Sequence, residues 1–184
     1  MSKNVLVPIS DGCEEIEAAC IIDVLRRADT DVTVASVGNL QITASRGIKI
    51  IADRLISECV NESYDLIALP GGMPGAERLR DSKELTELLT RQKQDGKLFA
   101  AICASPAIVL HHHGLLDDLK ATAYPGFAEQ LKNTESIESR VVVDGNCITS
   151  RGPGTALEFS LKLVEVLYGE DMAKKIADAM LVDL

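Results

Sequence analysis

Cys103 follows a short apolar run and precedes a proline, so we expect it to lie between a buried strand and a helix. The run is Leu98–Ile102, and Pro106 is tolerated only in the first turn of a helix. Ala101 and Ser105 flank Cys103 at two residues' distance and are small, as in a Gly-x-Ser-x-Gly nucleophile elbow. The free amides of a helix start favour a thiolate, which makes Cys103 a candidate nucleophile. The alternative is a buried cysteine that serves only as a small apolar side chain.

The three histidines are poor partners for this thiol. His111–His113 begin eight residues after Cys103, which is about 12 Å along a helix that rises 1.5 Å per residue. Consecutive helix positions also point in different directions, so the three side chains cannot chelate one metal ion from one helix face. We interpret them as the polar end of a helix, and no metal site is expected.

A carboxyl group is therefore the expected partner, and Glu17 is the strongest candidate. The apolar run that follows it, Ala18–Ile22, could desolvate this side chain. A desolvated glutamic acid has a raised pKa and can stay protonated beside a sulfur atom. Glu14 and Glu15 are expected to be first-turn charges of the same helix.

Two further turns could bind an anion or an oxyanion. The run Pro70–Ala76 lacks the Gly-Lys-Ser/Thr ending of a phosphate loop. It is either a plain glycine turn or the source of a backbone amide that forms an oxyanion hole with the amide of Ala104. Ser150–Thr155 is interpreted mainly as the entry to a helix, with anion binding as the alternative.

Strands and helices are expected to alternate along the chain. Candidate strands are Val5–Ile9, Val32–Val37, Leu66–Leu69, Leu98–Ile102 and Lys120–Tyr124, with hairpins over Leu40–Ile51 and Arg140–Thr149. Candidate helices are Glu14–Arg27, a segment from Asp81 or Ser82 to Gln94, Gly154–Leu167 and Asp171–Leu181. This pattern predicts an α/β fold with a mostly parallel sheet that is covered by helices and binds ligands at its carboxyl edge.

The composition excludes several classes of protein. The 184 residues suit one domain over 1–184, and the net charge of −9 with no Trp argues against a general nucleic-acid surface. No apolar run is long enough to cross a membrane, and the first residues enter a strand and do not resemble a secretory signal. Five scattered cysteines without a Cys-x-x-Cys pair are expected to be free thiols in the cytoplasm.

Four motifs together resemble the ThiJ/PfpI superfamily, in its YajL-like branch related to the parkinsonism-associated protein deglycase. They are Asp11–Glu17, Leu69–Gly72, Ala100–Ala104 and Thr149–Thr155, in this order along the chain. The resemblance implies a flavodoxin-like three-layer α/β sandwich with a nucleophile elbow, a homodimer and no cofactor. The apolar residues Ile21–Ile22 and Val24–Leu25 of the first helix are a candidate subunit contact as well as part of the core.

The resemblance also implies roles for individual residues. Cys103 would be the nucleophile, Glu17 a protonated acid, and the amides of Gly72 and Ala104 would face a substrate oxygen. Some relatives place a histidine near the cysteine where this chain has Tyr124. A tyrosine, with an unperturbed pKa of about 10, is a poor proton shuttle at neutral pH, so Tyr124 is expected to contact substrate only.

Two functions stay open at this point. In the first, Cys103 attacks small dicarbonyls such as methylglyoxal, or glycated protein adducts, as in a glutathione-independent glyoxalase or deglycase. In the second, oxidation of Cys103 makes the protein a redox sensor and chaperone in oxidative stress, with little catalysis. The same residues serve both functions.

Overall fold

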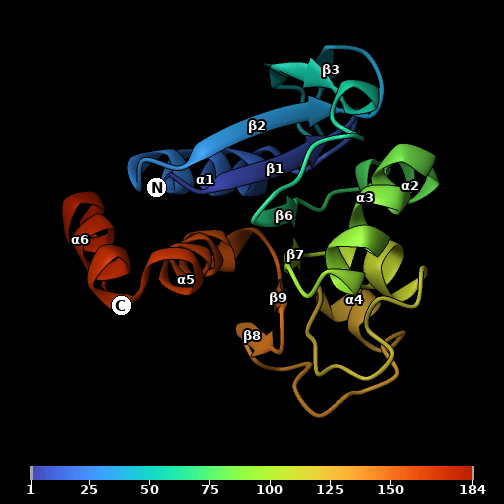
Figure 1. Ribbon diagram of the computed structural model, residues 1–184. Helices are drawn as coiled ribbons and strands as arrows, with labels where there is room; N and C mark the ends of the chain where they lie inside the picture. Colours follow the sequence, from blue (N-terminus) through green and yellow to red (C-terminus); the bar gives the residue numbers. More distant parts are fainter. Residues whose placement is uncertain (1, 184) are drawn as a thin grey trace.

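The computed structural model describes residues 2–183 and has a seven-stranded sheet between two layers of helices (Figure 1). The strand order is β5-β2-β1-β6-β7-β9-β8, and all neighbours are parallel except β8 and β9. The strands are β1 (Asn4–Ile9), β2 (Asp31–Ser36), β5 (Arg54–Leu55), β6 (Leu66–Leu69), β7 (Leu98–Ile102), β8 (Val141–Asp144) and β9 (Cys147–Ser150). The expected flavodoxin-like α/β sandwich is confirmed.

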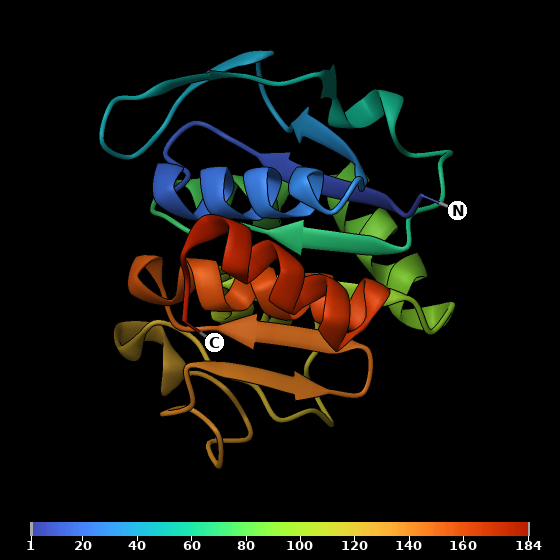
Figure 2. The same ribbon diagram turned by 90° about the vertical axis from the view of Figure 1, so that its left-hand side faces the viewer.

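Helices cover both faces of the sheet, and each face has its own apolar core. On one face lie α1 (Glu15–Arg27), α5 (Ala156–Tyr168) and α6 (Glu170–Met180), which stand in front of the sheet in Figure 2. On the other face lie α2 (Gly75–Asp81), α3 (Lys83–Gln94) and a π-helical segment, Pro106–His111. The central strands β1, β6 and β7 are buried almost throughout, as expected of parallel strands covered on both sides.

Most predicted elements are confirmed close to their predicted ends. Strand β7 spans the predicted residues, and both hairpins form, the first as β3 (Gln41–Thr43) and β4 (Lys49–Ile51). Helix α3 begins after Ser82, whose hydroxyl oxygen accepts a hydrogen bond from the Leu85 amide at 3.3 Å. None of the helices described between residues 2 and 183 is long and apolar enough to span a bilayer.

Two local predictions are wrong or incomplete. Lys120–Tyr124 pairs with no strand in the described chain, because the Thr122 amide donates to the Thr149 side-chain oxygen at 2.9 Å and not to a strand carbonyl. This segment leads instead into the short helix α4 (Pro125–Ala128). Helix α2 was not predicted, since Pro74 and Gly75 at its start are typical of a turn.

Candidate active site

Cys103 occupies a strained turn at the carboxyl end of β7. Its φ of +66° lies in the left-handed region, which non-glycine residues rarely adopt. Both of its backbone groups are fixed from outside: its amide donates to the Ser150 carbonyl at 3.0 Å, and its carbonyl accepts from the Tyr124 amide at 2.8 Å. Such strain persists where the surroundings determine the geometry. The geometry is that of the predicted nucleophile elbow.

The turn after β6 approaches this elbow too closely for any side chain. A Cβ atom on Gly71 would lie 2.6 Å from the Cβ of Cys103 and 2.8 Å from the Ile102 carbonyl oxygen. Gly72 has a φ of +88°, and a Cβ there would lie 2.4 Å from the Glu14 amide nitrogen. Glycine is therefore required at both positions, because the segments that follow β1, β6 and β7 pack together without room for a Cβ atom.

Glu17 lies beneath the thiol and is completely buried. Its Oε2 accepts a hydrogen bond from the Gly71 amide at 2.7 Å, while its Oε1 has no partner that meets hydrogen-bond geometry within residues 2–183. Burial raises the pKa of Glu17 to about 7, although the hydrogen bonds from the Gly71 amide and the neighbouring Cys103 thiol act to lower it. A carboxyl group with this pKa can hold or release a proton near neutral pH.

The expected low pKa of Cys103 is wrong. Burial, followed by the negative charge of Glu17, raises the pKa of this thiol to about 12. The amides of Gly72 and Ala104 are hydrogen-bonded to the sulfur and act in the opposite direction, but they do not outweigh the other two causes. Protonation of Glu17 removes its charge, so the thiol and the carboxyl titrate as a coupled pair. The sequence could not show how deeply the sulfur is buried.

Cys103 opens into a cavity of about 360 Å³. The cavity brings together three of the other predicted site residues, Gly72, Ala104 and Tyr124, while Glu17 lies beneath it. It is also lined by residues that the sequence did not single out for this site: Ser45, Arg46, Met73, Phe127 and Pro153. The cavity is large enough for a small molecule.

The β3–β4 hairpin reaches this cavity because its turn is tied to the start of α1. The Ser45 amide donates to the Cys13 carbonyl at 2.8 Å, and the Ser45 hydroxyl lies 3.0 Å from Glu14 Oε2 and 2.8 Å from Glu15 Oε2. Glu14 is the N-cap residue of α1 and also lines the cavity, so it has more than the predicted helix role. No local sequence signal links a hairpin turn to a helix 30 residues away.

The histidines lie away from the thiol, as predicted. His113 Nε2 is 2.9 Å from the Arg80 carbonyl oxygen and 3.3 Å from Thr86 Oγ1, where it ties the end of α2 to α3. Within residues 2–183, no group of three or more His, Cys, Asp or Glu side chains is arranged to hold a metal ion.

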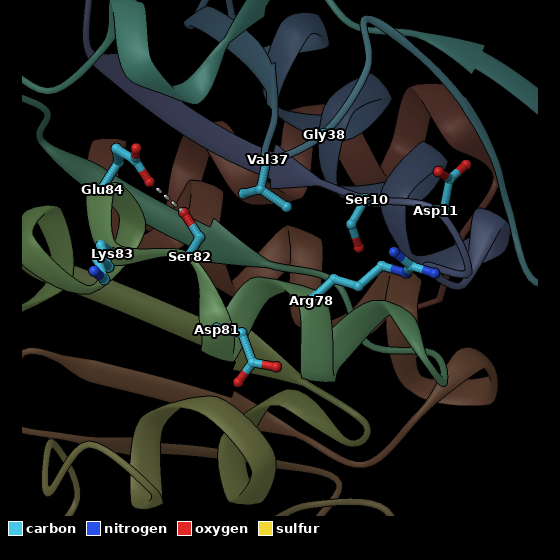
Figure 3. Close-up of a pocket in the computed structure, with 9 residues that line it drawn as sticks. All are labelled: Ser10, Asp11, Val37, Gly38, Arg78, Asp81, Ser82, Lys83 and Glu84. Atoms are coloured by element: carbon cyan, nitrogen blue, oxygen red, sulfur yellow. Dashed lines mark hydrogen bonds between the residues drawn. The ribbon is translucent and has the colours of Figure 1, made fainter.

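Figure 3 shows a second cavity, of about 510 Å³, between the carboxyl ends of β1 and β2 and helices α2 and α3. The Arg78 side chain extends there toward Ser10 and Asp11. The lining carries charges of both signs and includes none of the predicted catalytic residues. The chemistry predicted from the sequence therefore belongs to the smaller cavity at Cys103.

Comparison with known families agrees with this geometry. A model of the DJ-1/PfpI family matches residues 3–166. The chain belongs to this family. A solved DJ-1/PfpI structure titled "Toxoplasma gondii DJ-1, oxidized" is 54% identical, with a TM-score of 0.97 and complete coverage of both chains.

Two curated DJ-1/PfpI relatives differ in length and in name. Protein DJ-1 homolog B of Arabidopsis thaliana is 52% identical over 98% of this chain, but the match covers only 42% of that relative's length. The chain therefore spans less than half of it. A Caenorhabditis elegans relative named glutathione-independent glyoxalase DJR-1.2 is 35% identical over 95% of this chain and 93% of its own length.

The raised pKa of Glu17 predicts how stability depends on pH. Burial raises the pKa of Glu17 from 4.5 to about 7. The neutral carboxyl group therefore contributes its full stabilisation of the folded state below pH 4.5, and this stabilisation is lost as the pH rises through 7. The free energy of unfolding of the native protein should therefore fall by about 3 kcal/mol relative to Glu17→Gln between roughly pH 4 and pH 8. Urea unfolding at a series of pH values measures this difference.

Glu15→Gln is the matched control. Burial acts to raise the pKa of Glu15, yet hydrogen bonds from backbone amides and from the Ser45 hydroxyl hold it below its ordinary value. The stabilisation by ionised Glu15 is present above the unfolded-state pKa of this group and is lost as the pH falls. The free energy of unfolding of the native protein relative to Glu15→Gln should therefore rise with pH, opposite to the trend relative to Glu17→Gln. A stability difference between native protein and Glu17→Gln that does not change with pH would contradict the assignment.

Proposed function

We propose that the protein detoxifies small reactive dicarbonyls through Cys103, as a glutathione-independent glyoxalase or a deglycase. One observation carries the proposal: a fully buried carboxyl oxygen of Glu17 has no conventional partner within residues 2–183 and lies beside a thiol that opens into a cavity. A nucleophile paired with a proton acceptor, with backbone amides next to both, suits addition to an aldehyde. The name of the Caenorhabditis elegans relative supports the same class of reaction.

The first step couples a proton transfer to bond formation. The Cys103 sulfur forms a bond to the aldehyde carbon while the thiol proton passes to the Glu17 carboxylate. The carbonyl electron pair moves to the oxygen, which accepts hydrogen bonds from the amides of Gly72 and Ala104. These amides already face the sulfur and need little reorganisation. Glu17 then passes the thiol proton to the oxygen, so the product of this step is a neutral hemithioacetal and Glu17 is again a carboxylate.

The later steps use Glu17 as a proton carrier. As a carboxylate it moves a proton from the former aldehyde carbon to the neighbouring ketone carbon, while the hemithioacetal hydroxyl proton passes to the former ketone oxygen. This leaves an α-hydroxy thioester on Cys103. Water then cleaves the C–S bond, restores the thiol and releases a hydroxy acid such as lactate. The sum is one dicarbonyl plus one water to one hydroxy acid, without an external oxidant or cofactor. Tyr124, 47% exposed, borders the substrate but is assigned no proton transfer.

Replacement of Glu17 tests this mechanism. Glu17→Gln keeps the volume but removes the transferable proton, so methylglyoxal turnover without glutathione should fall by roughly 100- to 10,000-fold, the usual value of a general acid–base. Cys103 should remain alkylatable by iodoacetamide. Glu15→Gln, whose side chain holds the hairpin by way of Ser45, should lose far less. Near-normal turnover in folded Glu17→Gln would remove Glu17 from the mechanism.

The alternative function is redox sensing with a chaperone role, and the site also offers an observation in its favour. The amides of Gly72 and Ala104 and a protonated Glu17 could hold the oxygens of a sulfinic acid on Cys103. Two molecules of peroxide convert a thiolate to a sulfinate and leave two molecules of water. The 54% identical Toxoplasma gondii structure is described as oxidized, which supports this possibility.

Mild peroxide should therefore add two oxygens to Cys103 before it modifies any other cysteine, since the amides of Gly72 and Ala104 and a protonated Glu17 can hold the sulfinate there. Cys20 is the critical comparison, because it is the other cysteine that is not fully buried. Burial raises the pKa of the Cys20 thiol. Peptide mass spectrometry over a peroxide series gives the order, and modification of Cys20 ahead of Cys103 would count against the sensor function.

We also propose a cytoplasmic homodimer. All five cysteines are free thiols, which suits a reducing compartment. The subunit contact predicted for Ile21–Ile22 and Val24–Leu25 needs correction, because Ile21, Val24 and Leu25 are fully buried and serve only the core of their own chain, and Ile22 alone is half-buried. Exposed apolar side chains lie nearby instead, on α1 and the β3–β4 hairpin: Ile16, Ile48 and Ile51, which are 53–72% exposed. We assign the contact to this apolar surface.

Light scattering should give a mass of about twice the 19.8 kDa chain at micromolar concentration. The double variant Ile48→Glu/Ile51→Glu should be monomeric, because it places charges in the apolar surface. Val143→Glu is the control, since Val143 is an exposed apolar residue on the edge strand β8, and this variant should stay dimeric. A monomeric native protein would refute the dimer.

A further inference from the structure

Met73 is a second sulfur-containing residue at the cavity that Cys103 opens into. It follows Gly72, whose amide is hydrogen-bonded to the Cys103 sulfur, and it lines the cavity with Tyr124 and Phe127. Met73 is 40% exposed. Met172 and Met180 in α6 are only half-buried as well, but neither lines this cavity. An oxidant that enters the cavity therefore meets a thioether and a thiol together.

The two sulfur atoms differ in what they need before they react. A thiol must ionise to become nucleophilic, and burial raises the pKa of the Cys103 thiol to about 12. A thioether has no proton to lose, so its reaction with peroxide does not wait for ionisation. Under mildly acidic conditions the exposed Met73 is the more available of the two.

We propose that Met73 is a modification site, at which peroxide forms methionine sulfoxide and thereby restricts access to Cys103. The thioether sulfur attacks one peroxide oxygen, so an S–O bond forms and the O–O bond breaks. The sulfur loses two electrons, and the leaving hydroxide takes up the remaining proton as water. Methionine sulfoxide reductases reverse the change, so the modification can act as a switch.

The effect on Cys103 follows from the character of the cavity lining. Tyr124, Phe127 and Pro153 give it apolar or aromatic side chains besides Met73, and Glu14, Ser45 and Arg46 give it polar ones. Oxidation converts a flexible apolar side chain into a polar one with a strong acceptor oxygen. In a cavity of only about 360 Å³, this oxygen takes space and adds an acceptor close to the amides of Gly72 and Ala104. Small molecules should then reach the thiol more slowly.

The experiment uses the full chain and hydrogen peroxide at about pH 6, where thiols are mostly protonated. Peptide mass spectrometry follows one added oxygen at Met73, Met172 and Met180. After peroxide is removed, the rate constant for iodoacetamide alkylation of the remaining Cys103 thiol is measured. Met73→Leu, a volume-conserving variant, and Met172→Leu, the matched control, are each compared with their own untreated samples.

Met73 should be oxidised first, and alkylation of Cys103 should then slow by roughly 3- to 10-fold, since small displacements at a reacting centre change rates by up to about 100-fold. Met172→Leu should respond like the native protein, Met73→Leu should not respond, and a sulfoxide reductase should restore the rate. Oxidation of Met172 or Met180 before Met73, or an unchanged rate at a fully oxidised Met73, would overturn the inference. The readout does not use dicarbonyl turnover, so it can fail or succeed independently of the proposed catalysis.

Discussion

The hydrogen bond from the Gly71 amide to the buried Glu17 carboxyl is the interaction on which the site depends. At 2.7 Å it joins the helix that follows β1 to the turn that follows β6, directly beneath the elbow that follows β7. It satisfies one oxygen of Glu17, while the other has no partner that meets hydrogen-bond geometry within residues 2–183, and the Cys103 thiol lies next to the carboxyl group. A buried carboxyl group with one satisfied oxygen is held in place and is costly to ionise. The Gly71 amide thus fixes the position of Glu17, while burial outweighs this hydrogen bond and raises the pKa of Glu17.

The surrounding contacts make this geometry rigid. The Gly71 carbonyl accepts from the Glu14 amide at 2.9 Å, and the Ser105 hydroxyl donates to the Pro70 carbonyl at 2.6 Å. The turn after β6 is therefore tied on one side to α1 and on the other to the segment after Cys103. The strained φ of Cys103 is maintained by its own backbone hydrogen bonds with Ser150 and Tyr124, so the sulfur, the acid and the backbone donors are positioned before any substrate arrives.

Features determined by local chemistry could be predicted from the sequence, and features determined by tertiary contacts could not. The apolar run before Cys103 and the capping hydroxyl of Ser82 each define an element within a few residues, and both are confirmed. The pKa of Cys103 depends on burial and on a charge 86 positions away, so the local prediction of a thiolate failed. The hairpin residue Ser45 reaches the cavity through side-chain contacts with α1, which no periodicity reveals.

The most direct test of the account is the pH dependence of Cys103 alkylation in the native protein and in Glu17→Gln. The carboxylate of Glu17 is, after burial, the main cause that raises the pKa of the thiol to about 12. The neutral amide of Glu17→Gln removes that charge and leaves the Gly72 and Ala104 amides in place, so the apparent pKa of Cys103 should fall clearly below its native value. An alkylation profile that is the same in both proteins would show that the thiol and the carboxyl group are not coupled.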